Sequence, residues 1–520
     1  MSIGGHEGDG PDRPDRSGLR RLGEPHWLWL SVFGASLGLF LIRFLIPTPV
    51  GQADNRDGPR LMCGALGLKP VVPHGYPTYF RFAYFQYVHG QCSRSPYATS
   101  EVVPLVLARL LTPALGLHGV LNLIALGIIV CVLASVAIAS LAVGLRIRPW
   151  AQILIAAGIW LIVADAAFFD LFAGPYSEPA AIVGLLLIAT GVVYLGRDQR
   201  ASLYGLIVGG TGGFLVVLAK EQYVFLAVPI CVTLILASAH REGGRGLTRF
   251  RTRQVTAAAA VAGILALTAV AYQVWNANSP YGQRTQPMRT VDTIFEHIVS
   301  PGDKTKAADL RALGLPVSWT KYAGTYYWGA RSVRTDPLYQ RYEPKLTDSH
   351  MALYFVTHPS RILSVGDQAA NEGLRVRVTN LGDYSPQAGA RPGALDSREI
   401  AVSWLAQRLP PRLGLLWLVL LWVVMGVVAL LALRRRRMPW HREGAVIVLC
   451  MTGCAVMGFI PPAYFDGIAT ARHMAVMNFC IALAFAMTVA LAVSMIYHGA
   501  RRIPQRIANQ AQVVTAARAR

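Results

Sequence analysis

Long apolar stretches alternate with short polar segments along almost the whole chain. Ten of these stretches approach the length of about 20 mostly apolar residues that a helix needs to cross the hydrocarbon of a bilayer. They cover residues 27–47, 119–144, 149–169, 176–196, 203–219, 222–238, 254–274, 414–434, 445–462 and 474–496. The first is followed by Ile46-Pro47 rather than by a small-residue cleavage site, so we expect it to stay as a helix. The pattern predicts an all-α polytopic membrane protein with about ten transmembrane helices.

The basic residues between these stretches indicate which side of the membrane each loop occupies. If the N-terminus is cytosolic, the inner segments hold 23 arginines, whereas the short outer loops hold only Lys220 and Arg472. Basic residues in short loops resist translocation, so we predict cytosolic N- and C-termini in the cell (plasma) membrane.

The domain organisation follows from this topology. It consists of a cytosolic tail (1–26), a first span (27–47), a first outer loop with juxtamembrane helices (48–118), a bundle of six spans (119–274), an extracytoplasmic domain of mixed secondary structure (275–413), three final spans (414–496) and a basic cytosolic tail (497–520).

The composition excludes several classes of protein. The chain is 53% hydrophobic and 15% charged, which rules out a disordered chain or a small disulfide-stapled domain. Its formal net charge of +21 lies mostly in the inner segments. That excess is therefore a topology signal, and we expect the lipid bilayer rather than a nucleic acid as partner. The excess of arginine over lysine is typical of a high-GC bacterial genome.

The first outer loop contains two stretches that suit the membrane interface, Tyr76–Val88 and Val102–His118. The former is rich in aromatic rings, which favour the depth of the lipid headgroups. Cys63 and Cys92 share this loop, and a disulfide in an oxidising exterior or two free thiols are both open.

Ionisable residues at the ends of spans gather on the predicted outer side. Such residues cost energy near the bilayer and are therefore candidates for function. They are Asp54, Asp57, Asp165, Asp170, Glu178, Lys220, Glu221, Asp466, Arg472 and His473.

Each of these residues also has a structural explanation. The string Asp54–Gly58 is typical of a turn, and it also fits a loop that binds a divalent cation. Ser177 suits the N-cap of a helix with Glu178 in its first turn. Lys220-Glu221 suits a solvated turn, and Arg472 suits an interfacial anchor. No zinc-ligand spacing or phosphate-binding glycine loop occurs, so the sequence implies no cofactor beyond that candidate cation.

Several short motifs resemble the GT-C superfamily of polytopic glycosyltransferases. After the acidic first outer loop, they are Tyr176-Ser-Glu-Pro179, Ala219-Lys-Glu-Gln-Tyr223, Leu310-Arg-Ala-Leu-Gly-Leu-Pro316, Thr357-His-Pro359 and Ala471-Arg-His-Met474. The resemblance implies a polyprenyl-phosphate sugar donor and catalysis on the outer face. It also implies an acidic catalytic base in the first outer loop, here Asp54 or Asp57. The chain departs from the usual pattern because these acids are three residues apart and the large outer segment precedes the last three spans.

The chemistry of such a transfer suggests roles for the remaining rim residues. A carboxylate accepts the proton of the acceptor hydroxyl, and cations stabilise the departing phosphate. Lys220 and Arg472 are the candidates for binding the donor phosphate. The candidates for binding other parts of the substrates are Glu178, Glu221, Tyr223, Asp466 and His473. The acceptor is expected to be a cell-envelope glycan, a lipid or a protein.

A membrane transporter or flippase of lipid-linked or envelope precursors is the alternative function. It would carry broken helices or charges near the midplane of the bilayer. The segment Gly209–Gly213 is the best candidate for such a break, although glycines also allow close helix packing.

Overall fold

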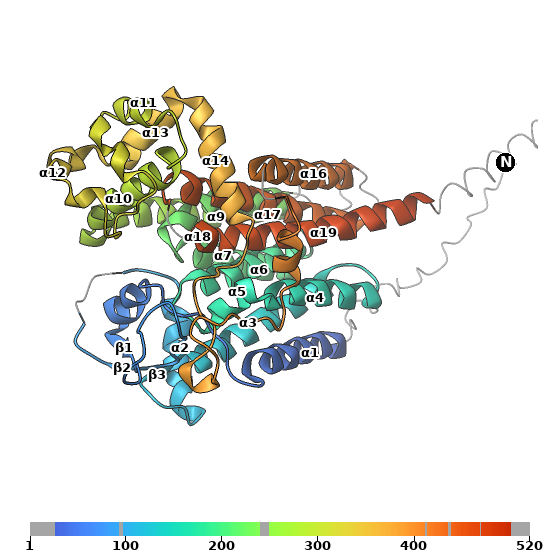
Figure 1. The fold of residues 1–520 in the computed structure, drawn as a ribbon. Coiled ribbons are helices and arrows are strands. Elements are labelled where there is room, and N and C mark those ends of the chain that lie inside the picture. Colours follow the sequence, from blue (N-terminus) through green and yellow to red (C-terminus); the bar gives the residue numbers. More distant parts are fainter. Residues whose placement is uncertain are drawn as a thin grey trace, which may run out of the picture.

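The computed structural model describes residues 26–92, 97–239, 249–410, 413–434, 438–467 and 470–500. They form a helical bundle with two smaller lobes at one end (Figure 1). Within these ranges, eight helical segments are long and apolar enough to cross a bilayer. They are α1 (His26–Leu45), α3 (Leu123–Gly144), α7 (Gln199–Val217), η4 with α8 (Glu221–Leu226 and Ala227–Ala239), α9 (Arg249–Asn278), α16 (Gly414–Arg434), α17 (Pro439–Tyr464) and α19 (Ala475–Ala500). The protein is an all-α polytopic membrane protein, as the apolar pattern predicts.

The predicted span at 149–169 is bent rather than straight. Helix α4 (Pro149–Ala164) and the following α5 and η3 (Ala166–Phe169 and Asp170–Ala173) meet at 61°. Asp165 lies at the break, where its Oδ1 accepts hydrogen bonds from the amide of Ala167 at 3.0 Å and the hydroxyl of Ser403 at 2.6 Å. Its Oδ2 accepts from the amides of Val402 and Ser403. Asp165 thus ends one helix and caps two others.

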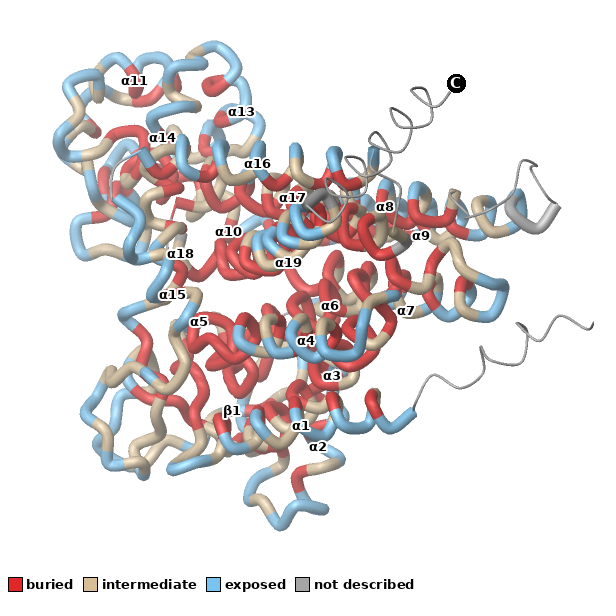
Figure 2. The backbone as a smooth tube through the Cα atoms, turned by 90° about the vertical axis from the view of Figure 1, so that its right-hand side faces the viewer, coloured by how far each residue is buried: buried red, intermediate tan, exposed pale blue. Residues whose placement is uncertain are grey.

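The predicted span at 176–196 forms α6 (Glu178–Tyr194), which has only 17 residues. It is buried along nearly its whole length in the interior of the bundle (Figure 2). Ten apolar segments are therefore helical in the described chain, but one is bent and one is short for a span. The hydrophobic pattern alone does not distinguish a helix surrounded by protein from one that faces lipid.

Helices α6 and α7 pack so closely that only glycines fit at their contact. A Cβ atom on Gly191 would lie 2.6 Å from the Cα of Gly209, and one on Gly212 would lie 2.5 Å from the carbonyl oxygen of Gly184. Helix α7 runs unbroken through this glycine-rich stretch. The glycines therefore serve close helix packing and do not unwind the helix.

Replacing Gly212 with valine should destabilise the bundle by about 1–3 kcal/mol, because the added side chain forces two buried helices apart. Gly263 on α9 is the matched control, since a Cβ there meets nothing within 4 Å. We expect a clear drop in Tm in detergent for Gly212→Val and little change for Gly263→Val. Equal Tm values for the two variants would contradict the packing role.

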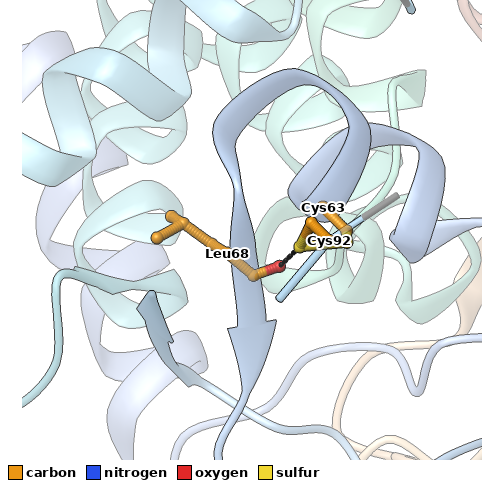
Figure 3. The surroundings of a disulfide bond; sticks show 3 residues. All are labelled: Cys63, Leu68 and Cys92. Carbon is orange, nitrogen blue, oxygen red and sulfur yellow. Dashed lines mark hydrogen bonds between the residues drawn. A yellow bond between two sulfur atoms is a disulfide. The ribbon is translucent and has the colours of Figure 1, made fainter. Parts of the chain in front are cut away.

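The first lobe is built from the loop after α1. Strands β1 (Leu68–Pro70), β2 (Gln86–His89) and β3 (Leu121–Asn122) form a small antiparallel sheet in that order. Figure 3 shows Cys63 and Cys92 joined by a disulfide beside Leu68 of β1, with Cα atoms 5.4 Å apart. This bond ties the segment before the sheet to the segment after β2.

Only one of the two expected juxtamembrane stretches is a helix. Helix α2 (Val102–Ala114) buries one face and exposes apolar side chains such as Leu110, as an interfacial helix does. The aromatic stretch Tyr76–Val88 instead forms loop and strand β2. Phe82, Tyr84 and Tyr87 are buried there, because large aromatic side chains favour extended backbone on which they pack against their neighbours. The helices of this loop are therefore η2 (Pro59–Ala65) and α2, and the aromatic stretch is not one of them.

The second lobe is the segment between α9 and α16. Its described residues form helices and loops and no strand, so the expected mixed secondary structure is replaced by a helical fold. Its helices are α10 (Pro280–Asp292), η5 (Thr293–Ile298), α11 (Lys306–Ala312), η6 (Val317–Tyr322), η7 (Val333–Thr335), α12 (Tyr339–Tyr342), η8 (Glu343–Lys345), α13 (Asp348–Thr357), α14 (Pro359–Gly373), η9 (Pro386–Ala388) and α15 (Ala401–Ala406). A separate hydrophobic core around Phe295 and Trp319 holds residues 291–365 of this lobe together, whereas apolar residues of its later part, such as Leu381, pack into the core of the bundle.

A buried ionic network joins this lobe to the bundle and to the first lobe. Arg43 at the end of α1 contacts Asp396 at 2.5 Å and Asp170 at 3.3 Å, and Arg377 contacts Asp383 at 2.8 Å. The backbone of residues 382–384 also bonds to residues 51–53 and 80–83 of the first lobe. Asp170, expected at the outer rim, therefore has an architectural role that fixes the loop before Asp54.

Candidate functional site

Four connections between helices meet at the end of the bundle that carries the two lobes. They are the loop after α1, the start of α6, the start of η4 and α18 (Thr470–His473). A pocket lies among the first three, with Asp57, Arg60, Leu61, Tyr97, Pro175, Tyr176, Ser177, Glu178 and Lys220 in its wall. Arg472 of α18 contacts this wall through Asp57. Most of the predicted site residues are thus brought together.

The acidic loop Asp54–Gly58 is held by its own polar groups. Oδ1 of Asp54 accepts hydrogen bonds from the amides of Arg56 at 2.8 Å and Gly58 at 2.9 Å. Tyr176 fastens the loop to α6, because its hydroxyl donates to the carbonyl of Ala53 and accepts from the amide of Asn55. The turn predicted for Asp54–Gly58 is therefore confirmed.

Asp54 lies outside the pocket wall and is buried. Burial raises the pKa of its carboxyl to about 6, even though the amides of Gly58 and Arg56 favour the charged form. Its carboxylate is engaged with the backbone of the loop, so Asp54 shapes the loop that presents Asp57.

Asp57 is the acidic residue of this loop that lines the pocket. Its Oδ2 lies 2.5 Å from Nη1 of Arg472, and its Oδ1 lies 2.5 Å from Nη2 of Arg60. Burial alone would raise the pKa of the Asp57 carboxyl, but the charges of Arg472 and Arg60 bring it well below its usual range. Asp57 is therefore ionised at neutral pH.

Lys220 and Glu178 form a buried ion pair in the same pocket wall. Nζ of Lys220 lies 3.2 Å from Oε1 of Glu178, and both side chains are almost fully buried. The expected N-cap from the side chain of Ser177 does not form. Instead, Oε2 of Glu101 accepts the hydrogen bond of the Ala180 amide at 2.8 Å, so a residue 79 positions earlier caps α6.

Arg472 is surrounded by groups that orient it. Its guanidinium lies 5.4 Å from the ring centre of Tyr176, and Nη2 lies 2.6 Å from Nε2 of His473. His473 in turn places Nδ1 at 2.9 Å from a carboxylate oxygen of Asp466. Nε of Arg472 is buried without a hydrogen-bond partner among the described residues. A buried donor of this kind is available to a ligand or to water.

Glu221 and Tyr223 lie on the side of the site that faces the second lobe. Oε1 of Glu221 contacts Nη1 of Arg289 on α10 at 2.9 Å, and Arg289 also lies 3.8 Å from Asp348. Tyr223 is buried, and its hydroxyl has no hydrogen-bond partner in the described chain. The second lobe thus reaches the site through Arg289.

Sequence reasoning missed several residues of the site. Arg60 lies in a long outer loop, and long loops are left out when basic residues are counted for topology. Tyr97, Glu101 and Arg289 also stand outside the short loops. The spacing of Asp57 and Arg60 at i, i+3 was the one local signal available.

The candidate divalent-cation loop has its carboxylates engaged elsewhere. Asp54 bonds to amides and Asp57 to two arginines. In the described chain, no group of three or more His, Cys, Asp or Glu side chains is arranged to hold a metal ion. The loop is thus held by amides and cations that belong to the protein.

The comparison with known families supports the architecture of the chain. The family described as "YfdI N-terminal transmembrane domain" matches residues 22–512. The chain belongs to this family. The match covers both lobes and every membrane-crossing helix, so the lobes are part of the YfdI N-terminal transmembrane domain rather than an addition to it. No protein with a curated description matches the chain.

Proposed function

We propose that this chain is an integral membrane glycosyltransferase of the GT-C type. It transfers a sugar from a polyprenyl-phosphate-linked donor to a cell-envelope acceptor on the outer face of the plasma membrane of a bacterium. The observation that carries the proposal is the position of Asp57, an ionised carboxylate in a pocket shared with Arg60 and Lys220 at one end of a membrane bundle. A base and a set of phosphate-binding cations are what this reaction needs.

The charge of the site suits a donor with a single phosphate. Among the charged groups joined by these contacts, the cations Arg60, Lys220 and Arg472 exceed the carboxylates Asp57 and Glu178 by one positive charge. A phosphodiester that links a lipid to a sugar carries one negative charge, so it neutralises this excess. Its tail can lie among the helices while the phosphate stays at the rim.

Donor binding would also prepare Asp57 for catalysis. Arg472 and Arg60 lower the pKa of Asp57, which makes it a weak base. A donor phosphate that also pairs with these two arginines weakens their interaction with the carboxylate of Asp57. It also adds a negative charge beside that carboxylate. The pKa of Asp57 then rises towards the range in which it accepts the proton of the acceptor hydroxyl. That hydroxyl attacks the anomeric carbon, and the lipid phosphate leaves towards Lys220 and Arg472.

The sidedness of the bundle supports catalysis on the outer face. Arg146 and Arg197 both contact Glu443, and these residues lie at the ends of α3, α6 and α17 away from the pocket. Basic residues of short loops mark the cytosolic side. The lobes and the pocket then face the exterior, where lipid-linked sugars are used.

The proposal is tested by comparing the envelope glycans and lipid-linked sugars of a deletion strain with those of its parent. We expect one sugar to be missing from an envelope glycan and its lipid-linked donor to accumulate. Complementation with the wild-type gene should restore the sugar, and complementation with Asp57→Asn should not. Unchanged glycans together with an unchanged pool of lipid-linked sugars would contradict a role in sugar transfer.

A further inference from the structure

Asp466, His473, Arg472 and Asp57 form a continuous chain of polar contacts. The successive distances are 2.9 Å from Asp466 to Nδ1 of His473, 2.6 Å from Nε2 of His473 to Arg472, and 2.5 Å from Arg472 to Asp57. All four side chains lie where two helix connections meet, and those of His473 and Arg472 are more than nine-tenths buried. The pocket wall includes Asp57 but neither His473 nor Asp466.

The chemistry of the contacts determines where the proton of His473 lies. A guanidinium can only donate hydrogen bonds, so Nε2 of His473 must accept from Arg472. The imidazole is then neutral, with its proton on Nδ1, which lies 2.9 Å from a carboxylate oxygen of Asp466. Asp466 thereby selects the tautomer that leaves Nε2 free to accept. A protonated imidazole, or the neutral tautomer with its proton on Nε2, would direct an N–H towards Arg472.

The loop that carries Asp466 is itself held by the second lobe. Nε2 of His297 on η5 lies 2.8 Å from the carbonyl oxygen of Gly467. A Cβ atom at Gly467 would lie 2.8 Å from the backbone carbonyl atoms of Asp292, so only glycine fits there. Nε2 of Gln222 donates to the carbonyl of His473 at 3.1 Å. Asp466 and His473 are therefore fixed relative to both the lobe and η4.

We propose that Asp466 and His473 are positioning residues that orient the guanidinium of Arg472 for the donor phosphate. This inference rests on the proposed function, because it assigns their role to a cation of that site. Nη2 of the guanidinium contacts Nε2 of His473 and Nη1 lies against the carboxylate of Asp57, while Nε and Nη1 are both buried without a hydrogen-bond partner among the described residues. Without His473, the side chain of Arg472 loses its second anchor and the direction of Nε is no longer defined.

A double-mutant cycle with a phosphate probe tests the inference on the full-length protein in detergent. The probe is citronellyl phosphate, a short isoprenyl monophosphate, and its affinity is measured by titration calorimetry. We expect His473→Ala to weaken binding by about tenfold, the value of one hydrogen bond to a charged group. His473→Gln should recover part of this loss, because its amide oxygen can still accept from Arg472. Asp466→Ala removes the acceptor for Nδ1 of His473, so it should weaken binding and should add little in the His473→Ala background.

The decisive measurement repeats His473→Ala in the Arg472→Lys background. A lysine has no second donor edge, so the loss caused by His473→Ala should shrink to less than about twofold there. The matched control is the exposed His350, whose replacement by alanine should leave binding unchanged.

Three results would overturn the inference, and they distinguish its failure from the failure of the proposed function. If Arg472→Ala abolishes binding but His473→Ala does not change it, the positioning role fails and the phosphate site stands. If His473→Ala lowers the affinity equally in the wild type and in Arg472→Lys, His473 has a general structural role. The positioning role then also fails while the phosphate site stands. If binding persists in Arg472→Ala, the phosphate assignment of the proposed function fails, and the positioning role fails with it.

Discussion

Replacing Asp57 with asparagine should lower the rate of sugar transfer by about 10²- to 10⁴-fold, the range over which a positioned general base contributes. Asparagine has the shape of aspartate, but its single amide oxygen can accept from only one of Arg60 and Arg472, and it cannot take up a proton. The effect should appear in kcat, with donor binding largely kept. The assay measures transfer from a labelled lipid-linked sugar by protein in detergent or nanodiscs.

Asp54→Asn should behave differently because Asp54 uses its carboxylate to hold the loop. The amide oxygen of asparagine can still accept from the amides of Arg56 and Gly58, so most of the activity should remain. Asp54→Ala removes that acceptor and should lower the rate much more. Activity lost equally in Asp54→Asn and Asp57→Asn would contradict this division of roles.

The raised pKa of Asp54 adds a test of stability. Its folded-state pKa of about 6 exceeds the ordinary value of 3.8, so folding favours the protonated form. The stabilising contribution of this group is present below about pH 4 and is lost as the pH rises through about 6. Asp54→Asn, which is always neutral, should therefore show a higher Tm than the wild type at pH 7.5. The difference should narrow as the pH falls towards 5.

Asp303→Asn serves as the control for the loss of a carboxylate. Asp303 lies in the second lobe, where it pairs with Arg361, and Arg361 keeps Asp309 as a second partner. We expect wild-type rates from this variant. Full activity in Asp57→Asn would remove Asp57 from the role of base, whatever the behaviour of Asp54.

Replacing Arg472 with alanine should raise the KM for the donor by about 10- to 100-fold, the value of losing charge-assisted contacts with a phosphate. The substitution also leaves Asp57 with Arg60 as its remaining close cation. The loss of stability should therefore stay below the ~3–5 kcal/mol that follows when a buried charge loses its only partner. Donor titration and thermal unfolding measure the two effects separately.

Arg472→Lys and Arg56→Ala are the controls for this prediction. Lysine keeps the charge but lacks the fork that reaches Asp57 and His473 together, so it should recover only part of the affinity. Arg56 lies in the same acidic loop but is exposed and contacts aromatic rings rather than the pocket. Its replacement should leave the KM unchanged. An unchanged KM in Arg472→Ala would remove Arg472 from the donor site.

Much of the fold follows from the sequence because membrane helices are specified by local composition. All ten apolar stretches are helical in the described residues, since a backbone in lipid must satisfy its own hydrogen bonds. The acidic loop was also identified correctly, because Asp, Asn and Gly favour turns over any short distance. The basic tails and most of the loop 240–253, on which the orientation depends, lie outside the described residues, so that part stays a prediction.

Contacts between distant segments were decided only by the tertiary structure. The bend at Asp165 depends on Ser403, which lies 238 positions away, and the cap of α6 comes from Glu101. Asp54 and Asp57 are equivalent in sequence terms, and the fold separates them by turning one to the backbone and the other to Arg60 and Arg472. The sequence by itself determined which residue types reach the rim of the membrane. Their roles depend on burial and on partners brought close by folding, and neither can be read from local hydropathy.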